Sequence, residues 1–125
     1  MGARAEVVQS AYDAFGRGDI PAILGMLDEG VAWTSPRTLP QGGTYKGPGE
    51  VGSFFEKVGA AWERLDARPQ AIGEVDDDRA VALVRLDGTR RGGEAQGYEA
   101  VHVFTVRDGR ITGFAEYTDL EAPLG

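Results

Sequence analysis

The chain of 125 residues is long enough for one domain with a single hydrophobic core, and its 42% hydrophobic residues are ordinary for a globular protein. No apolar run approaches the roughly 18 residues that span a bilayer, so we expect no membrane segment. With 13 lysine and arginine residues against 20 aspartate and glutamate residues, the net charge of -7 argues against nucleic acid as a partner. The absence of cysteine excludes a disulfide framework and the N-terminus lacks a secretory pattern, so we expect a cytoplasmic protein.

Two helices are predicted at the start of the chain. Residues 3–16 carry apolar side chains at helical spacing, including Tyr12 on the inward stripe, and the glycines that follow end the helix. Asp19 is then placed to be the N-cap of a short second helix, with Pro21 in its first turn and an apolar face that reaches Leu27. The chain therefore opens with two amphipathic helices.

A strand, a loop and a third helix are predicted next. Residues 31–35, VAWTS, alternate between apolar and polar side chains as a strand does. Residues 38–45, TLPQGGTY, are rich in turn-forming residues, and we interpret them as a flexible rim of a pocket that leads into a short strand at 44–46. The apolar spacing from Val51 to Leu65 predicts a long third helix. Its core face would carry Phe54, Phe55 and Trp62.

The remaining part of the chain has the pattern of antiparallel β structure. Turn signals separate its apolar segments: three aspartates at 76–78, a glycine-rich stretch at 88–93, and Asp108-Gly109. Strands are therefore predicted near residues 68–75, 79–87, 97–107 and 110–118. Three helices followed by a meandering antiparallel sheet is an α+β plan in one domain, residues 1–125.

His102, the only histidine, and Glu116 stand in the last two predicted strands among residues that are otherwise apolar. Whether the two side chains share a face of the sheet depends on the turn at 108–109. If that turn is a two-residue hairpin, Val101 rather than His102 lies on the face of Glu116.

A three-residue loop with a bulge at Gly109 gives a different register. Val106 then pairs with Arg110, and His102 lies opposite Phe114 and diagonal to the carboxylate. We favour this second register because it explains why two polar residues occur in these strands.

Two interpretations of His102 and Glu116 stay open. A lone histidine in a strand is commonly a surface or hydrogen-bonded core residue, and a glutamate near a strand end is commonly a solvated charge. If the pair shares an apolar cavity, the carboxylate and the imidazole are suited to proton transfer to and from carbon. With one histidine and no cysteine the chain offers few ligands to a transition metal, so no metal site is predicted.

The segments YDAFGRGDIPAILGML, GGTYKGPGEVGSFF and HVFTVRDGRITGF, in that order, resemble the SnoaL-like branch of the NTF2-like superfamily. Polyketide cyclases and ketosteroid isomerases belong to the same superfamily. The resemblance covers nearly the whole chain and implies a cone-shaped fold, in which three N-terminal helices pack on a curved antiparallel sheet. It is specific for the fold and weak for the reaction, because this scaffold supports many chemistries.

The resemblance also implies roles for single residues. Polyketide cyclases of this kind have a histidine and an acid at the positions of His102 and Glu116, and the acid, an aspartate in those enzymes, moves a proton during an aldol closure. Tyr12 matches the first-helix tyrosine of the ketosteroid isomerases, whereas Ser35 stands where those enzymes have their general base. Steroid isomerisation by that mechanism is not expected, since serine cannot replace a carboxylate base without a partner.

The leading hypothesis is an enzyme without a cofactor that moves protons in a small apolar carbonyl compound such as a polyketide intermediate. Cyclisation, isomerisation and dehydration all remain open as the reaction. Glu116 would be the general base or acid, and His102 would orient it or stabilise an enolate oxygen. The residues predicted to bind the substrate are Tyr12, Trp33, Ser35, Phe104 and Phe114.

Two other functions remain open. The same pocket could hold a hydrophobic ligand in a protein that moves no proton, or the chain could be a structural dimerisation module whose pocket is filled by side chains. The resemblance implies a homodimer formed through the open face of the sheet. That face would carry Val101, Val103, Ala115 and Tyr117.

Overall fold

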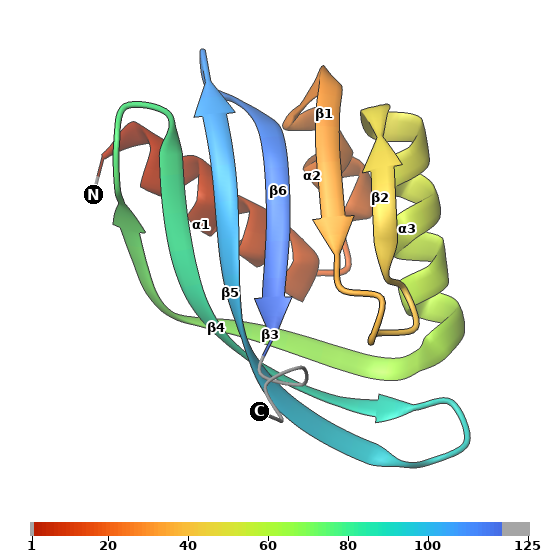
Figure 1. The fold of residues 1–125 in the computed structure, drawn as a ribbon. Helices are drawn as coiled ribbons and strands as arrows, with labels where there is room; N and C mark the ends of the chain where they lie inside the picture. The colour runs from red at the N-terminus through yellow and green to blue at the C-terminus, as the bar shows by residue number, and fades with distance from the viewer. Residues whose placement is uncertain (1, 119–125) are drawn as a thin grey trace.

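The structure, a computed structural model that describes residues 2–118, consists of three helices packed against the concave side of a curved six-stranded sheet (Figure 1). The helices are α1 (Ala3–Gly16), α2 (Ile20–Gly25) and α3 (Gly47–Ala61). The strands are β1 (Leu27–Ser35), β2 (Gly43–Lys46), β3 (Trp62–Glu74), β4 (Arg79–Arg90), β5 (Ala95–Arg107) and β6 (Arg110–Thr118). The predicted α+β fold class is confirmed. None of these helices is long and apolar enough to cross a membrane.

The sheet has the strand order β2-β1-β6-β5-β4-β3 and is mixed rather than fully antiparallel. Strands β3 to β6 form the predicted antiparallel meander, but β1 runs parallel to β6. The pairing aligns Trp33 with Phe114, which are far apart in the sequence. No turn connects these two strands, so no local signal in the sequence predicts the parallel pair.

The third helix is shorter than its apolar spacing predicts. It ends at Ala61, and Trp62 has the extended backbone angles φ -117° and ψ 130° that begin β3. Trp62 and Leu65 therefore belong to a strand, and the prediction of Trp62 on the core face of a helix is wrong. The reason is that an inward-facing strand residue directly after a helix continues the helix's apolar spacing by chance.

The hairpin between β5 and β6 combines features of both predicted registers. Asp108 and Gly109 form a two-residue turn with φ values of 54° and 77°, the left-handed angles that such turns require. In the next two pairs, Val106 faces Ile111 and Thr105 faces Gly113, so Thr112 is an extra residue in a bulge.

This bulge moves the register of β6 by one residue. His102 consequently pairs directly with Glu116, not diagonally as the favoured register predicted. The expectation that both side chains share one face is correct. The element that brings them there is a bulge inside β6 and not a bulge at the turn.

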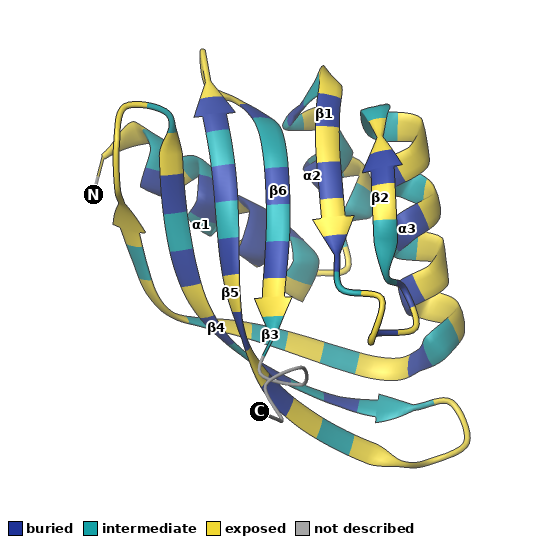
Figure 2. Cartoon of the chain, in the orientation of Figure 1, coloured by how far each residue is buried: buried dark blue, intermediate teal, exposed yellow. Residues whose placement is uncertain are grey.

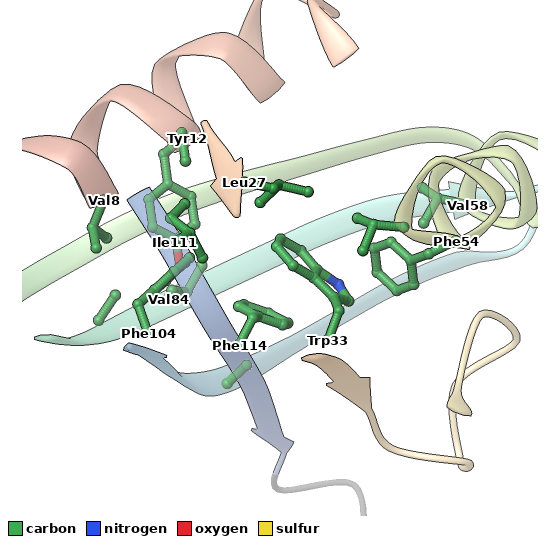
Figure 3. Close-up of a cluster of buried hydrophobic side chains, with 14 of the residues drawn as sticks. Val8, Tyr12, Leu27, Trp33, Phe54, Val58, Val84, Phe104, Ile111 and Phe114 are labelled. Carbon is green, nitrogen blue, oxygen red and sulfur yellow. The ribbon is translucent and has the colours of Figure 1, made fainter. Parts of the chain in front are cut away.

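The core lies between the helices and the inner face of the sheet, and burial alternates along β4 and β5 as the predicted strands require (Figure 2). Figure 3 shows Trp33 between Phe114 and Phe54, while Tyr12 and Val8 of α1 lie on the other side of the cluster, next to Ile111 and Phe104. The outer face of the sheet leaves larger apolar side chains exposed, including Leu83, Val101 and Tyr117.

Candidate functional site

Four buried polar side chains form one continuous chain of hydrogen bonds through the core. The Ser35 hydroxyl donates to Oε1 of Glu116 at 2.7 Å, and the other carboxylate oxygen lies 2.8 Å from Nε2 of His102. The second ring nitrogen of His102, Nδ1, is hydrogen-bonded to the hydroxyl of Tyr12. We call Ser35, Glu116, His102 and Tyr12 the polar chain.

The connectivity of the polar chain determines where its protons are. With Glu116 ionised, Nε2 of His102 carries hydrogen and donates to the carboxylate. Nδ1 then carries a lone pair, which accepts the Tyr12 hydroxyl proton. In this state every polar atom of the imidazole and of the carboxylate has a partner, which is what their burial demands.

Burial also controls the charge of Tyr12, which is 8% exposed. Burial first, and the negative charge of Glu116 second, raise the pKa of the Tyr12 hydroxyl above its ordinary value. The hydroxyl therefore stays protonated at neutral pH. It can release its proton to His102 only if it receives another proton in the same step.

Four elements, α1, β1, β5 and β6, position the polar chain. Tyr12 lies one helical turn after Val8 on the buried stripe of α1. Ser35 is the last residue of β1, and the parallel register that aligns Trp33 with Phe114 brings it beside Glu116. The site therefore depends on the one parallel strand pair of the sheet.

Beside the polar chain lies an apolar cavity of about 80 Å³. Of the predicted site residues, the six that line it are Tyr12, Trp33, His102, Phe104, Phe114 and Glu116. Ser35 does not line the cavity and instead lies behind Glu116. It is therefore placed to hold the carboxylate and not to touch a ligand.

Aromatic rings form much of the cavity wall beside the polar chain. Trp33 stacks on Phe114 with ring centroids 4.0 Å apart (Figure 3). Phe114 in turn meets the His102 ring, with centroids 4.9 Å apart. A flat apolar molecule would contact these rings favourably. At about 80 Å³ the cavity holds a few water molecules, so larger ligands require the half-buried lining residues, such as Phe55 and Leu65, to move.

Gln41 is a pocket residue that the sequence analysis missed. It lines the cavity and is 2% exposed, and its Oε1 accepts a hydrogen bond of 3.1 Å from the indole Nε1 of Trp62. Its backbone carbonyl accepts a second bond, from the Tyr45 hydroxyl at 2.8 Å. The segment predicted as a flexible rim thus inserts Leu39 and Gln41 into the core.

Two aromatic side chains have buried polar atoms that are poorly satisfied. The indole Nε1 of Trp33 and the hydroxyl of Tyr98 are buried without a well-formed hydrogen bond among residues 2–118. Burial, followed by the charge of Glu116, raises the pKa of Tyr98, while the neighbouring Gln41 side chain opposes the rise. Residues 2–118 contain no group of acidic, histidine or cysteine side chains that could hold a metal ion.

The SnoaL-like domain family matches residues 8–114, which is most of the chain. The chain belongs to the SnoaL-like family. It has no significant match among curated proteins. The resemblance stated from the sequence is thereby confirmed.

Solved structures give the same result for the fold. An NTF2-like protein of unknown function from Burkholderia pseudomallei is 30% identical, with a TM-score of 0.87 over 95% of this chain and 92% of that one. TerC, co-crystallised with polyporic acid, is 25% identical, with a TM-score of 0.86 over 95% of this chain and 93% of that one. A candidate polyketide cyclase from Xanthomonas campestris is 29% identical, with a TM-score of 0.75 over 94% and 91% of the two chains.

Proposed function

We propose that this SnoaL-like protein is an enzyme that transfers protons to and from carbon in an apolar carbonyl compound. The observation that carries the proposal is the buried polar chain, which ends on Tyr12 at the wall of an apolar cavity. Similarity to a candidate polyketide cyclase supports the same class of chemistry. The substrate would be a small, flat compound such as a polyketide intermediate.

The geometry favours Tyr12 as the group that meets the substrate. Both oxygens of Glu116 are already engaged, one by Ser35 and one by His102, so the carboxylate is poorly placed to take a proton directly. Tyr12 has oxygen lone pairs left after donating to His102. Glu116 would then act through the imidazole, as the negative charge that stabilises an imidazolium.

The proton transfer can be written in one balanced step. A proton leaves the carbon next to the substrate carbonyl for the Tyr12 oxygen, while the Tyr12 proton moves to Nδ1 of His102. The substrate becomes an enolate and His102 becomes an imidazolium paired with Glu116. Reversal at another carbon gives isomerisation. Alternatively, attack of the enolate on a second carbonyl closes a ring, and the stored proton returns to the new alkoxide.

The test uses deuterium exchange, because it needs no knowledge of the natural substrate. In D₂O the enzyme should catalyse deuterium incorporation into the benzylic carbon of 1-phenylpropan-2-one. Glu116→Gln keeps the shape of the site but removes the charge, and should reduce exchange by about 10² to 10⁴ with little change in ketone affinity. The Val75→Gln variant, altered at an exposed residue in the connection between β3 and β4, should exchange at the wild-type rate.

A second candidate function is that of a binding protein for a hydrophobic ligand. It is favoured by the fully paired state of the carboxylate, which is also what a purely structural buried network would show. Ketone binding without deuterium exchange by the wild-type protein would establish this alternative and overturn the enzymatic one.

We also propose a homodimer formed through the outer face of the sheet. Leu83 pairs with Val101, and Val101 with Tyr117, so the three make one apolar row across β4, β5 and β6. All three are exposed, with Tyr117 at 59%. Sedimentation should find a dimer that Val101→Lys converts to a monomer, whereas a monomeric wild-type protein would contradict the dimer without affecting the catalytic proposal.

A further inference from the structure

Gln41 lines the cavity, and its side chain contacts Trp62 and Tyr98, which lie outside the cavity lining. Tyr98 and His102 lie on the same face of β5, four residues apart, which corresponds to about 13 Å along the strand. Trp62 and Tyr98 are neighbours, with ring centroids 6.4 Å apart, and Trp62 holds the Gln41 amide. A ligand long enough to fill the cavity would therefore meet different polar groups at its two ends.

Trp62 determines which way the Gln41 amide faces. An indole N–H can only donate, so the atom that Trp62 contacts at 3.1 Å has to be the amide oxygen. The amino group of Gln41, which carries two donor hydrogens, is thereby turned toward other partners, and the Tyr98 hydroxyl can accept one of these hydrogens. The side chains of Trp62 and Gln41 are both almost fully buried, so packing also holds the amide in this orientation.

Two residues that line the cavity, Trp33 and Gln41, carry N–H groups that the core does not fully satisfy. Trp33 lines the cavity, and its indole N–H is buried without a hydrogen bond among the described residues. The amino group of Gln41 has two hydrogens, and the neighbouring Tyr98 hydroxyl oxygen can accept only one of them. The Gln41 oxygen is already occupied by Trp62. Buried donors without acceptors are costly, and an oxygen atom of a ligand would relieve that cost.

We propose that Gln41 and Trp33 form a second recognition site in the cavity, which binds a carbonyl oxygen of the ligand remote from the reacting carbon. This site, the donor end, rests on the proposed function for the identity of the reacting carbon. The donor end specifies the substrate class further. The substrate would be a flat apolar compound with two oxygen functions, one hydrogen-bonded by Tyr12 and the other by the donor end. A compound with a single carbonyl would satisfy only one of them.

The test compares two ketones that differ in one oxygen atom. The compound 1-(4-acetylphenyl)propan-2-one has a remote carbonyl, and 1-(4-ethylphenyl)propan-2-one has a methylene in its place. Because one hydrogen bond changes affinity modestly, the acetyl compound should bind about three- to tenfold more tightly to the wild-type protein. Gln41→Glu keeps an acceptor for Trp62 but removes the amino group, and should abolish the preference.

Nuclear magnetic resonance provides a readout that needs no variant. The chain contains four glutamines and no asparagine, so only four side-chain amide pairs occur in its spectrum. The acetyl compound should shift the Gln41 pair and the Trp33 indole signal, and the ethyl compound should leave the Gln41 pair unchanged. Absence of a Gln41 shift with the acetyl compound, whether or not it binds elsewhere, overturns the proposal.

The remaining outcomes separate this inference from the proposed function. A preference for the acetyl compound that survives in both Gln41→Glu and Gln41→Met overturns the donor end. If benzylic deuterium exchange continues in those variants, the catalytic proposal stands alone. If the Gln41 pair shifts but the wild-type protein exchanges no deuterium, the donor end is supported as a binding site and the catalytic proposal fails.

Discussion

The two ends of the cavity are both buried and both polar, but their hydrogen bonds are balanced differently. At the end formed by the polar chain, Ser35, Glu116 and His102 are satisfied by one another and by Tyr12. At the donor end, Trp62 satisfies the Gln41 oxygen while the Trp33 indole lacks a partner among residues 2–118. A closed network can hold and pass on a proton without a ligand. Buried N–H groups without acceptors, in contrast, are satisfied only when a ligand supplies an oxygen atom.

This difference suggests how one small domain divides catalysis from recognition. A fully paired network keeps its geometry in the empty protein, which is the preorganisation that proton transfer requires. Unpaired donors discriminate between ligands, because a compound without the matching acceptor leaves them unsatisfied. The stacked rings of Trp33 and Phe114 lie between the polar chain and the donor end and join the two.

The largest effect is expected on stability, from truncating Phe114, the ring that lies between the polar chain and Trp33. Phe114 is 7% exposed and contacts both Trp33 and His102, so Phe114→Ala should lower the free energy of unfolding by about 3–5 kcal/mol. Urea denaturation measures this loss. Phe15→Ala, which truncates a half-buried ring of the same lining, is the control and should cost less than half as much. Equal losses would mean that Phe114 is an ordinary core residue.

A smaller effect, confined to the polar chain, is expected from Tyr12→Phe. The ring remains while the hydroxyl that ends the chain is lost, so benzylic deuterium exchange should fall by about 10² or more. The preference for the acetyl ketone should persist, because that preference depends on Gln41. Exchange at the wild-type rate in this variant would exclude Tyr12 as the group that meets the substrate. Loss of the preference for the acetyl ketone would show that the remote carbonyl binds at the polar chain and not at Gln41.

The sequence predicts the residues of the polar chain better than those of the donor end. Tyr12, His102 and Glu116 can be recognised because polar residues interrupt apolar spacing in regular elements. Their assembly cannot be predicted equally well, since it requires the bulge at Thr112 and the parallel pairing of Ser35 beside β6. Both depend on contacts between distant segments.

Gln41 is harder to recognise from the sequence. It stands in a loop without periodicity, and its burial results from hydrogen bonds to Trp62 and Tyr45, which belong to other elements. The sequence offers no pattern that distinguishes it from an exposed loop glutamine. The assignment of Trp62 to a helix further concealed the partner that orients it.

The smallest expected effect is on stability in alkali, and it concerns Tyr12 of the polar chain and Tyr98, which lies beside Gln41. Burial raises the pKa of both Tyr12 and Tyr98 above the ordinary value of 10.0. Below pH 10 both residues are protonated in the folded and the unfolded chain, so they add no pH dependence there. Above pH 10 the unfolded chain loses these protons first, and the free energy of unfolding should fall by about 1.4 kcal/mol per pH unit for each residue.

Phenylalanine variants separate the two contributions. Tyr12→Phe and Tyr98→Phe should each reduce the alkaline slope by one proton, as measured by urea denaturation between pH 9 and pH 11. At neutral pH the two variants should differ. Tyr12→Phe leaves Nδ1 of His102 without its donor and should cost about 1–3 kcal/mol, whereas Tyr98→Phe removes a hydroxyl that lacks a well-formed bond and should be nearly neutral. Equal costs at neutral pH would show that the Tyr98 hydroxyl is as well satisfied as that of Tyr12.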